Sequence, residues 1–164
     1  MNSITENHLI SVYDIENYIK ITKKLTTPEL FDLMRNIQSI VVETVMEYRP
    51  LIIKNLGDSN LIVFNSDDIE LKIEALRNLK TKIEDFLSNH GFPERLNFAS
   101  HFGEITVGVI GIKPYSHTDA FGNEINYTFY ILGNASNEQF TISQNLYDRM
   151  NYNSQSKYKE FLFK

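Results

Sequence analysis

Hydrophobic and polar residues alternate with two different periods along the 164-residue chain. Within residues 26–49 and 69–91 the apolar side chains recur every three or four positions, which predicts two helices that each bury one face. Shorter runs rich in β-branched and aromatic residues predict strands. The predicted strands are residues 8–15, 51–56, 60–64, 95–102, 105–112, 126–132, 138–143 and 158–163.

Turn-forming residues separate these segments. The turn Gly57-Asp58-Ser59-Asn60 is expected to close one hairpin, and Gly103-Glu104 is expected to close a second between residues 102 and 105. Residues 113–125 contain Pro, Ser, Asp, Gly and Asn and are predicted to be a loop. A short helix is expected around residues 144–150, before the final strand.

The order of predicted elements is β-α-β-β-α-β, followed by further strands. This order is typical of a ferredoxin-like α+β fold, an antiparallel sheet with helices on one face, here within a single domain of residues 1–164. In such a sheet Asp14, at the end of the first strand, can lie beside the turn that holds Asp58. Two carboxylates at one sheet edge favour Mg²⁺ or Mn²⁺. The alternative is that Asp58 is only a good turn residue.

Composition excludes several classes of function. The net charge is -5 and no Lys/Arg cluster occurs, so we expect no nucleic-acid partner. The chain has no cysteine, which rules out disulfides, Cys-based zinc sites and thiol catalysis. No signal-peptide pattern and no apolar run near the ~20 residues of a spanning helix are found, so we expect a cytoplasmic protein without membrane contact.

Four segments resemble motifs of the class III nucleotidyl (adenylate and guanylate) cyclases, in the family's order. "VYDIENY" (12–18) resembles the first motif, commonly Phe-x-Asp-Ile-x-Gly-Phe, and "KNLGDSNLIVF" (54–64) is similar to the second. "NFASHFGEITVGVIG" (97–111) resembles the His-x-Gly-Glu segment. "YTFYILGNASN" (127–137) is similar to the strand and Gly that precede the family's Asn-bearing helix. The resemblance extends over most of the chain.

The resemblance implies an activity and a metal site. Asp14 and Asp58 would hold two Mg²⁺ or Mn²⁺ ions, with the backbone carbonyl of Ile15 as a further ligand. The metals would promote conversion of a nucleoside triphosphate to a 3′,5′-cyclic nucleotide and pyrophosphate. Because family members pack head to tail, with each site shared between two chains, the resemblance also implies a homodimer.

The resemblance also implies substrate contacts. The amides of Glu16, Asn17 and Tyr18 would open a helix that faces phosphate. Lys54 matches the family's base-contacting Lys, although a solvated strand residue is the alternative. Tyr130 lies where the family has an Asp or Thr that selects the base.

The chain departs from the family at a helix that normally reads Asn-x-x-x-Arg. Asn137 fits the Asn, but the Arg position falls on Thr141, and the helix itself looks shortened or absent. Losing one preorganised charge stabiliser typically lowers the rate by ~10²–10³. Two hypotheses therefore stand: a cyclase with weak turnover, or a degenerate domain that dimerises or binds nucleotide. A diguanylate cyclase is disfavoured because no Gly-Gly-Asp/Glu-Glu-Phe run occurs.

The histidines have no partners at metal-ligand spacing. His8, His90 and His117 are therefore expected at solvated positions, and His101, within the third motif, is expected to be structural.

Overall fold

The computed structural model describes residues 3–135 and 140–163. Its elements are β1 (Ile4–Ile15), α1 (Tyr18–Thr22), α2 (Thr27–Val45), η1 (Met46–Tyr48), β2 (Ile52–Leu56), β3 (Ser59–Phe64), α3 (Ile69–Asn89), β4 (Leu96–Ile110), β5 (His117–Phe121), α4 (Asn123–Asn134), β6 (Phe140–Ile142), α5 (Gln144–Arg149), α6 (Tyr152–Tyr158) and η2 (Lys159–Phe161). The sheet has the order β2-β3-β1-β4-β5, and β6 pairs with β4. All strand pairs are antiparallel except β4 with β6. The predicted α+β fold is confirmed.

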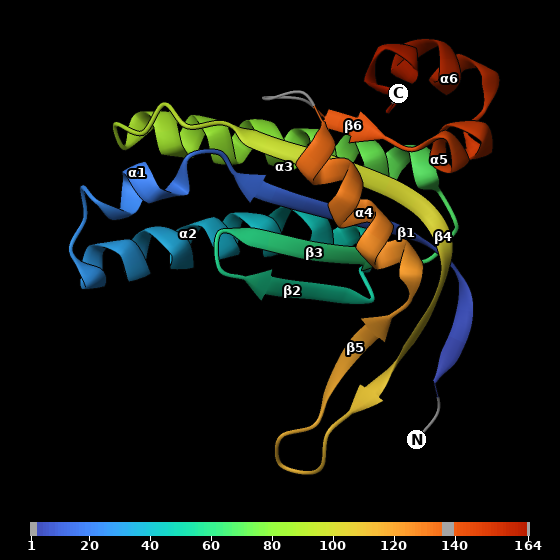
Figure 1. Cartoon of the computed structure of the whole chain (residues 1–164), viewed down its shortest axis with the longest axis horizontal. Helices are drawn as coiled ribbons and strands as arrows, with labels where there is room; N and C mark the ends of the chain where they lie inside the picture. Colours follow the sequence, from blue (N-terminus) through green and yellow to red (C-terminus); the bar gives the residue numbers. More distant parts are fainter. Residues whose placement is uncertain (1–2, 136–139, 164) are drawn as a thin grey trace.

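The central strand β1 buries side chains on both faces of the sheet. Leu9 and Tyr13 pack against α2 and α3, which cover one face as predicted (Figure 1). Ile10 and Val12 point the other way and pack with Ile131 of α4. A strand buried on both faces must be apolar along nearly its whole length, and residues 8–13 of β1 are buried throughout.

The predicted hairpin at Gly103-Glu104 is wrong, because β4 runs unbroken from Leu96 to Ile110. Gly103 pairs with His8 in the middle of the β1–β4 ladder. A Cβ atom at Gly103 would lie 2.6 Å from Cγ of Glu124 on α4. The glycine is therefore required for the close approach of a helix to the sheet and not for a turn.

The predicted strand at residues 126–132 is also wrong, since these residues belong to helix α4. Their aromatic and β-branched composition favours a strand. The buried positions, however, are Thr128, Ile131 and Leu132, which share one face of a helix. Part of the predicted loop before α4 is strand β5.

The C-terminal segment contains more helix than expected. β6 and α5 match the predictions for residues 138–150 in type. The predicted strand at residues 158–163 is wrong: α6 and η2 occupy most of this region, and Leu162 makes a single parallel bridge to Ile142. Within the described part of the chain, no helix combines the length and apolarity needed to cross a membrane.

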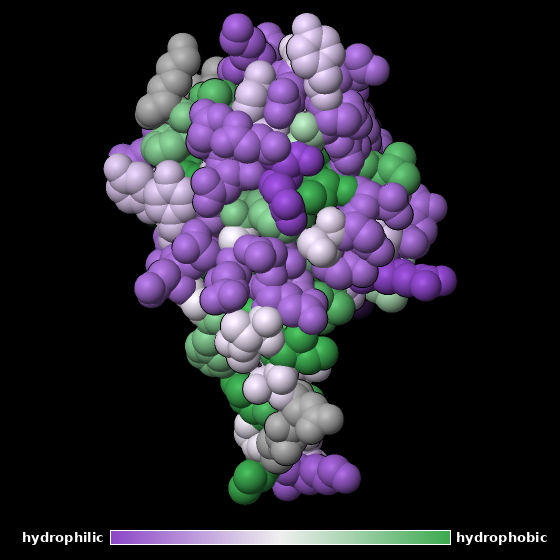
Figure 2. Space-filling view, turned by 90° about the vertical axis from the view of Figure 1, so that its right-hand side faces the viewer, coloured by the Kyte–Doolittle hydropathy of each residue, from purple (hydrophilic) through white to green (hydrophobic). Residues whose placement is uncertain are grey.

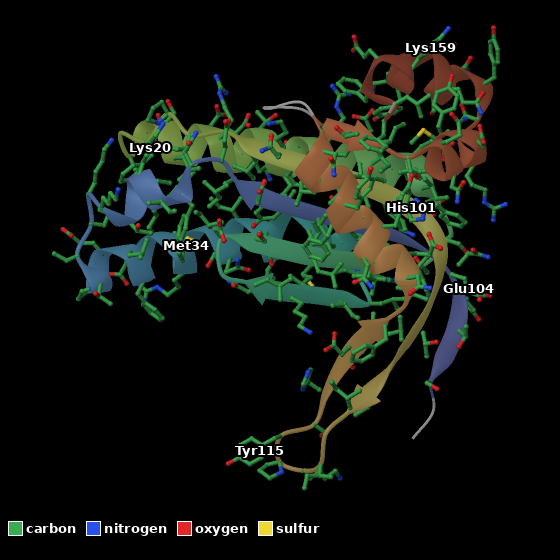
Figure 3. All side chains as sticks on the ribbon, in the orientation of Figure 1. Lys20, Met34, His101, Glu104, Tyr115 and Lys159 are labelled. Carbon is green, nitrogen blue, oxygen red and sulfur yellow. The ribbon has the colours of Figure 1, made fainter. Side chains whose placement is uncertain are left out.

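The outer half of β4 and strand β5 form an arm, residues 106–121, that projects from the body of the molecule (Figure 1). Tyr115 lies at its tip and is 83% exposed (Figure 3). Val109, Ile112 and Phe121 are also exposed, and Figure 2 shows hydrophobic side chains along this narrow extension. Exposed apolar residues gathered on one projection are typical of a contact surface.

Candidate active site

The two predicted metal ligands come together at one edge of the sheet. Asp14 is the residue before the last of β1 and pairs with Ser59, the first residue of β3. Asp58 directly precedes Ser59 in the tight turn between β2 and β3. Both carboxylates are half-buried. The structure therefore confirms the juxtaposition predicted from the order of the elements.

The carboxylate of Asp14 is in an unfavourable environment for a negative charge. Burial raises its pKa, and the charge of Asp58 raises it further, against an opposing hydrogen bond from Asn97. Its Oδ1 atom is buried without a hydrogen-bond partner. The pKa of Tyr18 is likewise raised, by burial and then by the charge of Asp58. Within residues 3–135 and 140–163, neither Asp14 nor Asp58 forms an ion pair with a Lys, Arg or His side chain. Their hard oxygen donors suit Mg²⁺ or Mn²⁺.

Asp14 and Asp58 meet at this edge, and the charge of Glu16 makes a smaller contribution to the raised pKa of Asp14. Among residues 3–135 and 140–163, no group of three or more His, Cys, Asp or Glu side chains is arranged to hold a metal ion. A divalent cation bound by Asp14 and Asp58 would thus need further ligands from backbone, solvent or substrate. This set of ligands is typical of Mg²⁺ sites that share the ion with a phosphate group.

The residues after β1 turn sharply into α1. Asn17 adopts the left-handed conformation, with φ 54°, which Asn tolerates better than most residues. The left-handed conformation of Asn17 agrees with the glycine that the resembling motif has at this position. The amide of Glu16 already donates to the carbonyl of Arg95 at 2.8 Å, so its predicted phosphate contact is not supported. The charge of Asp58 acts on Tyr18, and the phosphate contacts of Asn17 and Tyr18 stay a prediction.

Lys54 is paired, which contradicts the alternative that it is simply solvated. Its Nζ lies 2.6 Å from Oδ2 of Asp119 on β5, so the two edge strands approach one another here. Burial would raise the pKa of Asp119, but hydrogen bonds from Lys54 and from the amide of Ala120 outweigh burial and lower it. Nε2 of His117 lies 3.6 Å from the same oxygen. Asp119 was missed because it lies in the predicted loop.

The described helix nearest to the predicted Asn-x-x-x-Arg segment is α4, Asn123–Asn134, which ends before Asn137. Thr141 is buried in β6 and pairs with Ala99, so the assignment of the Arg position to Thr141 is wrong. Asn137 lies outside the described residues. Tyr130 is on α4 and not on a strand; it is 56% exposed and follows Asn126 by four residues. All twelve residues of α4 are described, and none is Lys or Arg.

His101 is structural, as predicted. It is fully buried, with Nδ1 2.7 Å from Oγ of Ser143 and Nε2 2.5 Å from Oε2 of Glu124. Burial lowers its pKa and Glu124 opposes this effect. The arrangement has the composition of a Ser-His-Glu triad, but Ser143 is buried and accepts a hydrogen bond from the amide of Leu146 as the N-cap of α5. The network joins β4, α4 and α5.

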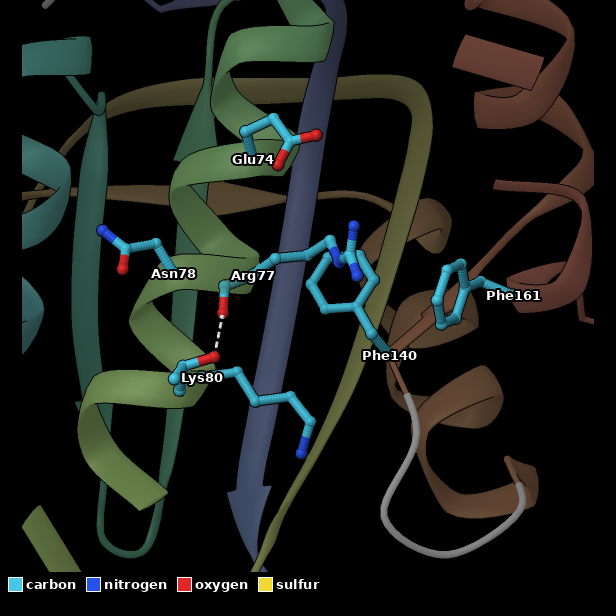
Figure 4. Close-up of a pocket in the computed structure, with 7 residues that line it drawn as sticks. Glu74, Arg77, Asn78, Lys80, Phe140 and Phe161 are labelled. Atoms are coloured by element: carbon cyan, nitrogen blue, oxygen red, sulfur yellow. Dashed lines mark hydrogen bonds between the residues drawn. The ribbon is translucent and has the colours of Figure 1, made fainter. Parts of the chain in front are cut away.

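A separate pocket of about 430 Å³ lies between α3 and the C-terminal segment (Figure 4). Arg77 and Lys80 extend from α3 on the side that faces Phe140 and Phe161. Arg77 stacks over Tyr158 and Phe161, and Lys80 donates to Glu84 and to the carbonyl of Leu96. None of the predicted site residues that the structure describes lines this pocket, and Arg77 and Lys80 are already engaged.

Comparison with known proteins identifies the family. The sequence model of the Adenylate and Guanylate cyclase catalytic domain matches residues 3–162, nearly the whole chain. The chain therefore belongs to the family of class III adenylate and guanylate cyclase catalytic domains. A search of curated proteins found no significant match.

Solved cyclase structures share the fold. The adenylyl cyclase CyaB from P. aeruginosa matches with a TM-score of 0.80 and 17% identity, over 91% of this chain and 82% of that one. The guanylyl cyclase Cya2 matches with a TM-score of 0.72 and 17% identity, over 92% and 81%. The guanylate cyclase domain of RhGC from Catenaria anguillulae, solved in complex with GTP, gives 0.75 and 15%, over 93% and 85%. At these identities the likeness shows the fold alone.

The raised pKa of Asp14 leads to a prediction about stability. The folded state favours protonated Asp14, so this stabilisation is complete below the ordinary carboxyl pKa of ~4 and is lost as pH rises through the raised pKa. We expect Asp14→Asn to raise the melting temperature by a few degrees at pH 7 without divalent metal, and the gain to vanish near about pH 3. Circular dichroism melts across pH measure this directly.

Asp119→Asn is the matched control. The pKa of Asp119 is lowered, so its stabilisation is present at neutral pH and is lost as pH falls. This variant should melt below the parent at pH 7 and approach it in acid. A lower melting temperature for Asp14→Asn at pH 7 would show that Asp14 is not electrostatically unfavourable.

Proposed function

We propose that the protein is a nucleotidyl cyclase that binds a metal–nucleoside triphosphate complex and converts it slowly to a 3′,5′-cyclic nucleotide and pyrophosphate. The observation that carries this proposal is the buried, unpartnered Oδ1 of Asp14 beside Asp58, in a chain of the cyclase family. A buried carboxylate oxygen left without a partner lowers stability, and such a group is often retained because a ligand needs it.

In this proposal Asp14 and Asp58 hold two divalent ions, with the carbonyl of Ile15 as a further donor. When bound, Mg²⁺ or Mn²⁺ would neutralise the triphosphate and lower the pKa of the attacking 3′-hydroxyl. Asn17 and Tyr18 follow Asp14 directly, so the backbone turn they form is placed to contact the phosphates. The chain itself would contribute the two carboxylates that hold the ions and the backbone turn that positions the phosphates.

The pair Lys54–Asp119 supports recognition of a base. It offers one donor, the ammonium, beside one acceptor, the carboxylate. The Watson–Crick edge of adenine presents an acceptor at N1 next to a donor at N6 and so matches this pair. Guanine presents an acceptor, O6, next to two donors, N1–H and N2–H, and the second donor finds no free partner here because Oδ1 of Asp119 already accepts from the amide of Ala120. We therefore assign base contact to Lys54 and Asp119 in place of Tyr130, and we propose ATP as the preferred substrate.

Helix α4 limits the expected rate. In cyclases that read Asn-x-x-x-Arg the Arg stabilises charge on the phosphates, whereas the corresponding residue here is Tyr130, four positions after Asn126. The same observation favours a second candidate function, nucleotide binding without turnover. Product formation separates the two.

Incubation with each of the four triphosphates and Mn²⁺, followed by mass spectrometry, tests the activity. We expect cyclic AMP as the main product, at a rate ~10²–10³-fold below the ~10 s⁻¹ median of enzymes. Mn²⁺ should support more product than Mg²⁺, because Mg²⁺ demands stricter geometry. Asp14→Asn and Asp58→Asn should each remove the product and weaken Mn²⁺–ATP binding, measured by calorimetry.

Asp32→Asn is the control for that experiment. Asp32 is an exposed carboxylate on α2 that pairs with Arg35, so its loss changes net charge without touching the site. Unchanged Mn²⁺–ATP affinity in both site variants would disprove the metal assignment. Binding without any cyclic product would instead support the second candidate function.

A cation placed at residue 130 should restore part of the missing charge stabilisation. We expect Tyr130→Arg to raise the rate of cyclic product formation by roughly 10²-fold, because the residue is exposed on the helix that follows β5. Asn134→Arg, one turn further along α4, is the matched control and should have little effect. Thr141→Arg should unfold the protein, since Thr141 is buried in β6. Equal rates for Tyr130→Arg and Asn134→Arg would refute this role for α4.

We further propose a homodimer that uses the arm. Ile112 and Tyr115 are almost fully exposed apolar residues at its tip, and a second copy would bury them. Light scattering at tens of micromolar should give twice the 19.1 kDa of the chain. Ile112→Asp should shift the mass toward the monomer, whereas Phe31→Asp, at another well-exposed apolar position, on α2, should not. A monomer at every concentration would overturn the proposal.

A further inference from the structure

His8 occupies a position that neither fold nor active site explains. It lies on β1 opposite Gly103 and is only 3% exposed, in contrast to the solvated position expected from the sequence. Both of its ring nitrogens are buried and make no hydrogen bond. A neutral imidazole carries one donor and one acceptor, and leaving both unsatisfied in the interior is unfavourable.

The side chain of His8 lines a cavity of about 320 Å³ at the base of the arm. β1 and β5 flank β4 in the sheet (Figure 1), and the cavity lies between side chains of all three strands. Its walls include Ile4, Val107 and Val109, which are apolar, and the hydroxyl-bearing Thr118. Ile4 and Val109 are partly exposed and so border its mouth.

The remaining polar groups restrict what the cavity can accept. The side-chain amide of Asn65 is already engaged, since it donates to Asp67 and accepts from Lys72. Glu6 is exposed and contributes a carboxylate to the lining. An anionic ligand would be repelled there, whereas a hydroxyl group can both donate to and accept from an imidazole.

We propose that this cavity binds a small neutral alcohol or phenol, whose apolar body lies against Ile4, Val107 and Val109 and whose hydroxyl hydrogen-bonds His8. Neither ring nitrogen is accessible from the cavity in this structure, so binding includes a turn of the imidazole about its Cβ–Cγ bond that brings a nitrogen to the cavity wall. The volume is at the lower end of small-molecule sites, which fits a ligand of about one ring. Thr118 directly precedes Asp119, the partner of Lys54. A ligand bound in the cavity is therefore close enough in the chain to perturb the Lys54–Asp119 ion pair. The site does not depend on turnover at Asp14 and Asp58.

Titration with 4-methylphenol, followed by the imidazole signals of the four histidines in long-range ¹H–¹⁵N spectra, tests the proposal. The ring signals of His8, assigned from the His8→Phe variant, should shift saturably with a dissociation constant of about 1 mM or below. His90 should not shift, because it lies at the end of α3, away from the cavity. The matched anion 4-methylbenzoate should bind about tenfold more weakly, and Glu6→Gln should reduce that difference.

Calorimetry on variants separates a polar contact from simple filling of an apolar space. His8→Phe should weaken 4-methylphenol binding about tenfold, and His8→Gln, which keeps a donor and an acceptor, should weaken it less. Thr118→Val removes a hydroxyl group from the cavity wall and leaves β1 unchanged. This variant should also weaken binding, which would show that the loss in the His8 variants is not due to misfolding of β1. No saturable shift up to about 10 mM, or equal affinity for the parent and His8→Phe, would overturn the proposal.

Discussion

The arrangement of the site depends on the antiparallel register of β1. The strand is paired on both sides, so that Asp14 lies opposite Ser59 of β3 and Asn97 of β4. One residue earlier, Tyr13 lies opposite Asn60 and accepts a hydrogen bond of 2.7 Å from its amide inside the core. A slip of one residue would move every side chain of β1 to the other face, separating Asp14 from the turn at Asp58. Burial on both faces makes such a slip very unfavourable.

Two carboxylates of the same sheet have opposite electrostatic environments. Asp119 is buried and paired with Lys54, and its pKa is lowered. Asp14 is half-buried beside another carboxylate, and its pKa is raised. The first pair is an ion pair within the chain, while for the second we propose that a bound cation offsets the two negative charges. This contrast is the physical reason to regard Asp14 and Asp58 as functional and not as structural residues.

The sequence was sufficient to predict the Asp14–Asp58 pair because its supporting elements have strong local signals. A polar turn between two apolar runs defines the β2–β3 hairpin, and two amphipathic helices fix the order of the fold. The sequence was insufficient to predict α4. Its Tyr, Thr and Phe residues favour a strand, and only the burial of one helical face against the sheet stabilises a helix there. The misplacement of α4 then moved the Arg position to Thr141 and hid Asp119. A lone His8 carries no sequence signal of burial at all.

The central claim is that Asp14 and Asp58 bind a divalent cation. Paramagnetic broadening of amide NMR signals by substoichiometric Mn²⁺ tests it most directly, since the effect falls steeply with distance from the ion. The account predicts selective loss of the signals of residues 14–18, 57–59 and 97, and their recovery in Asp14→Asn. Broadening centred instead on another acidic surface, such as Glu104 and Asp148, or broadening unchanged in Asp14→Asn, would contradict it.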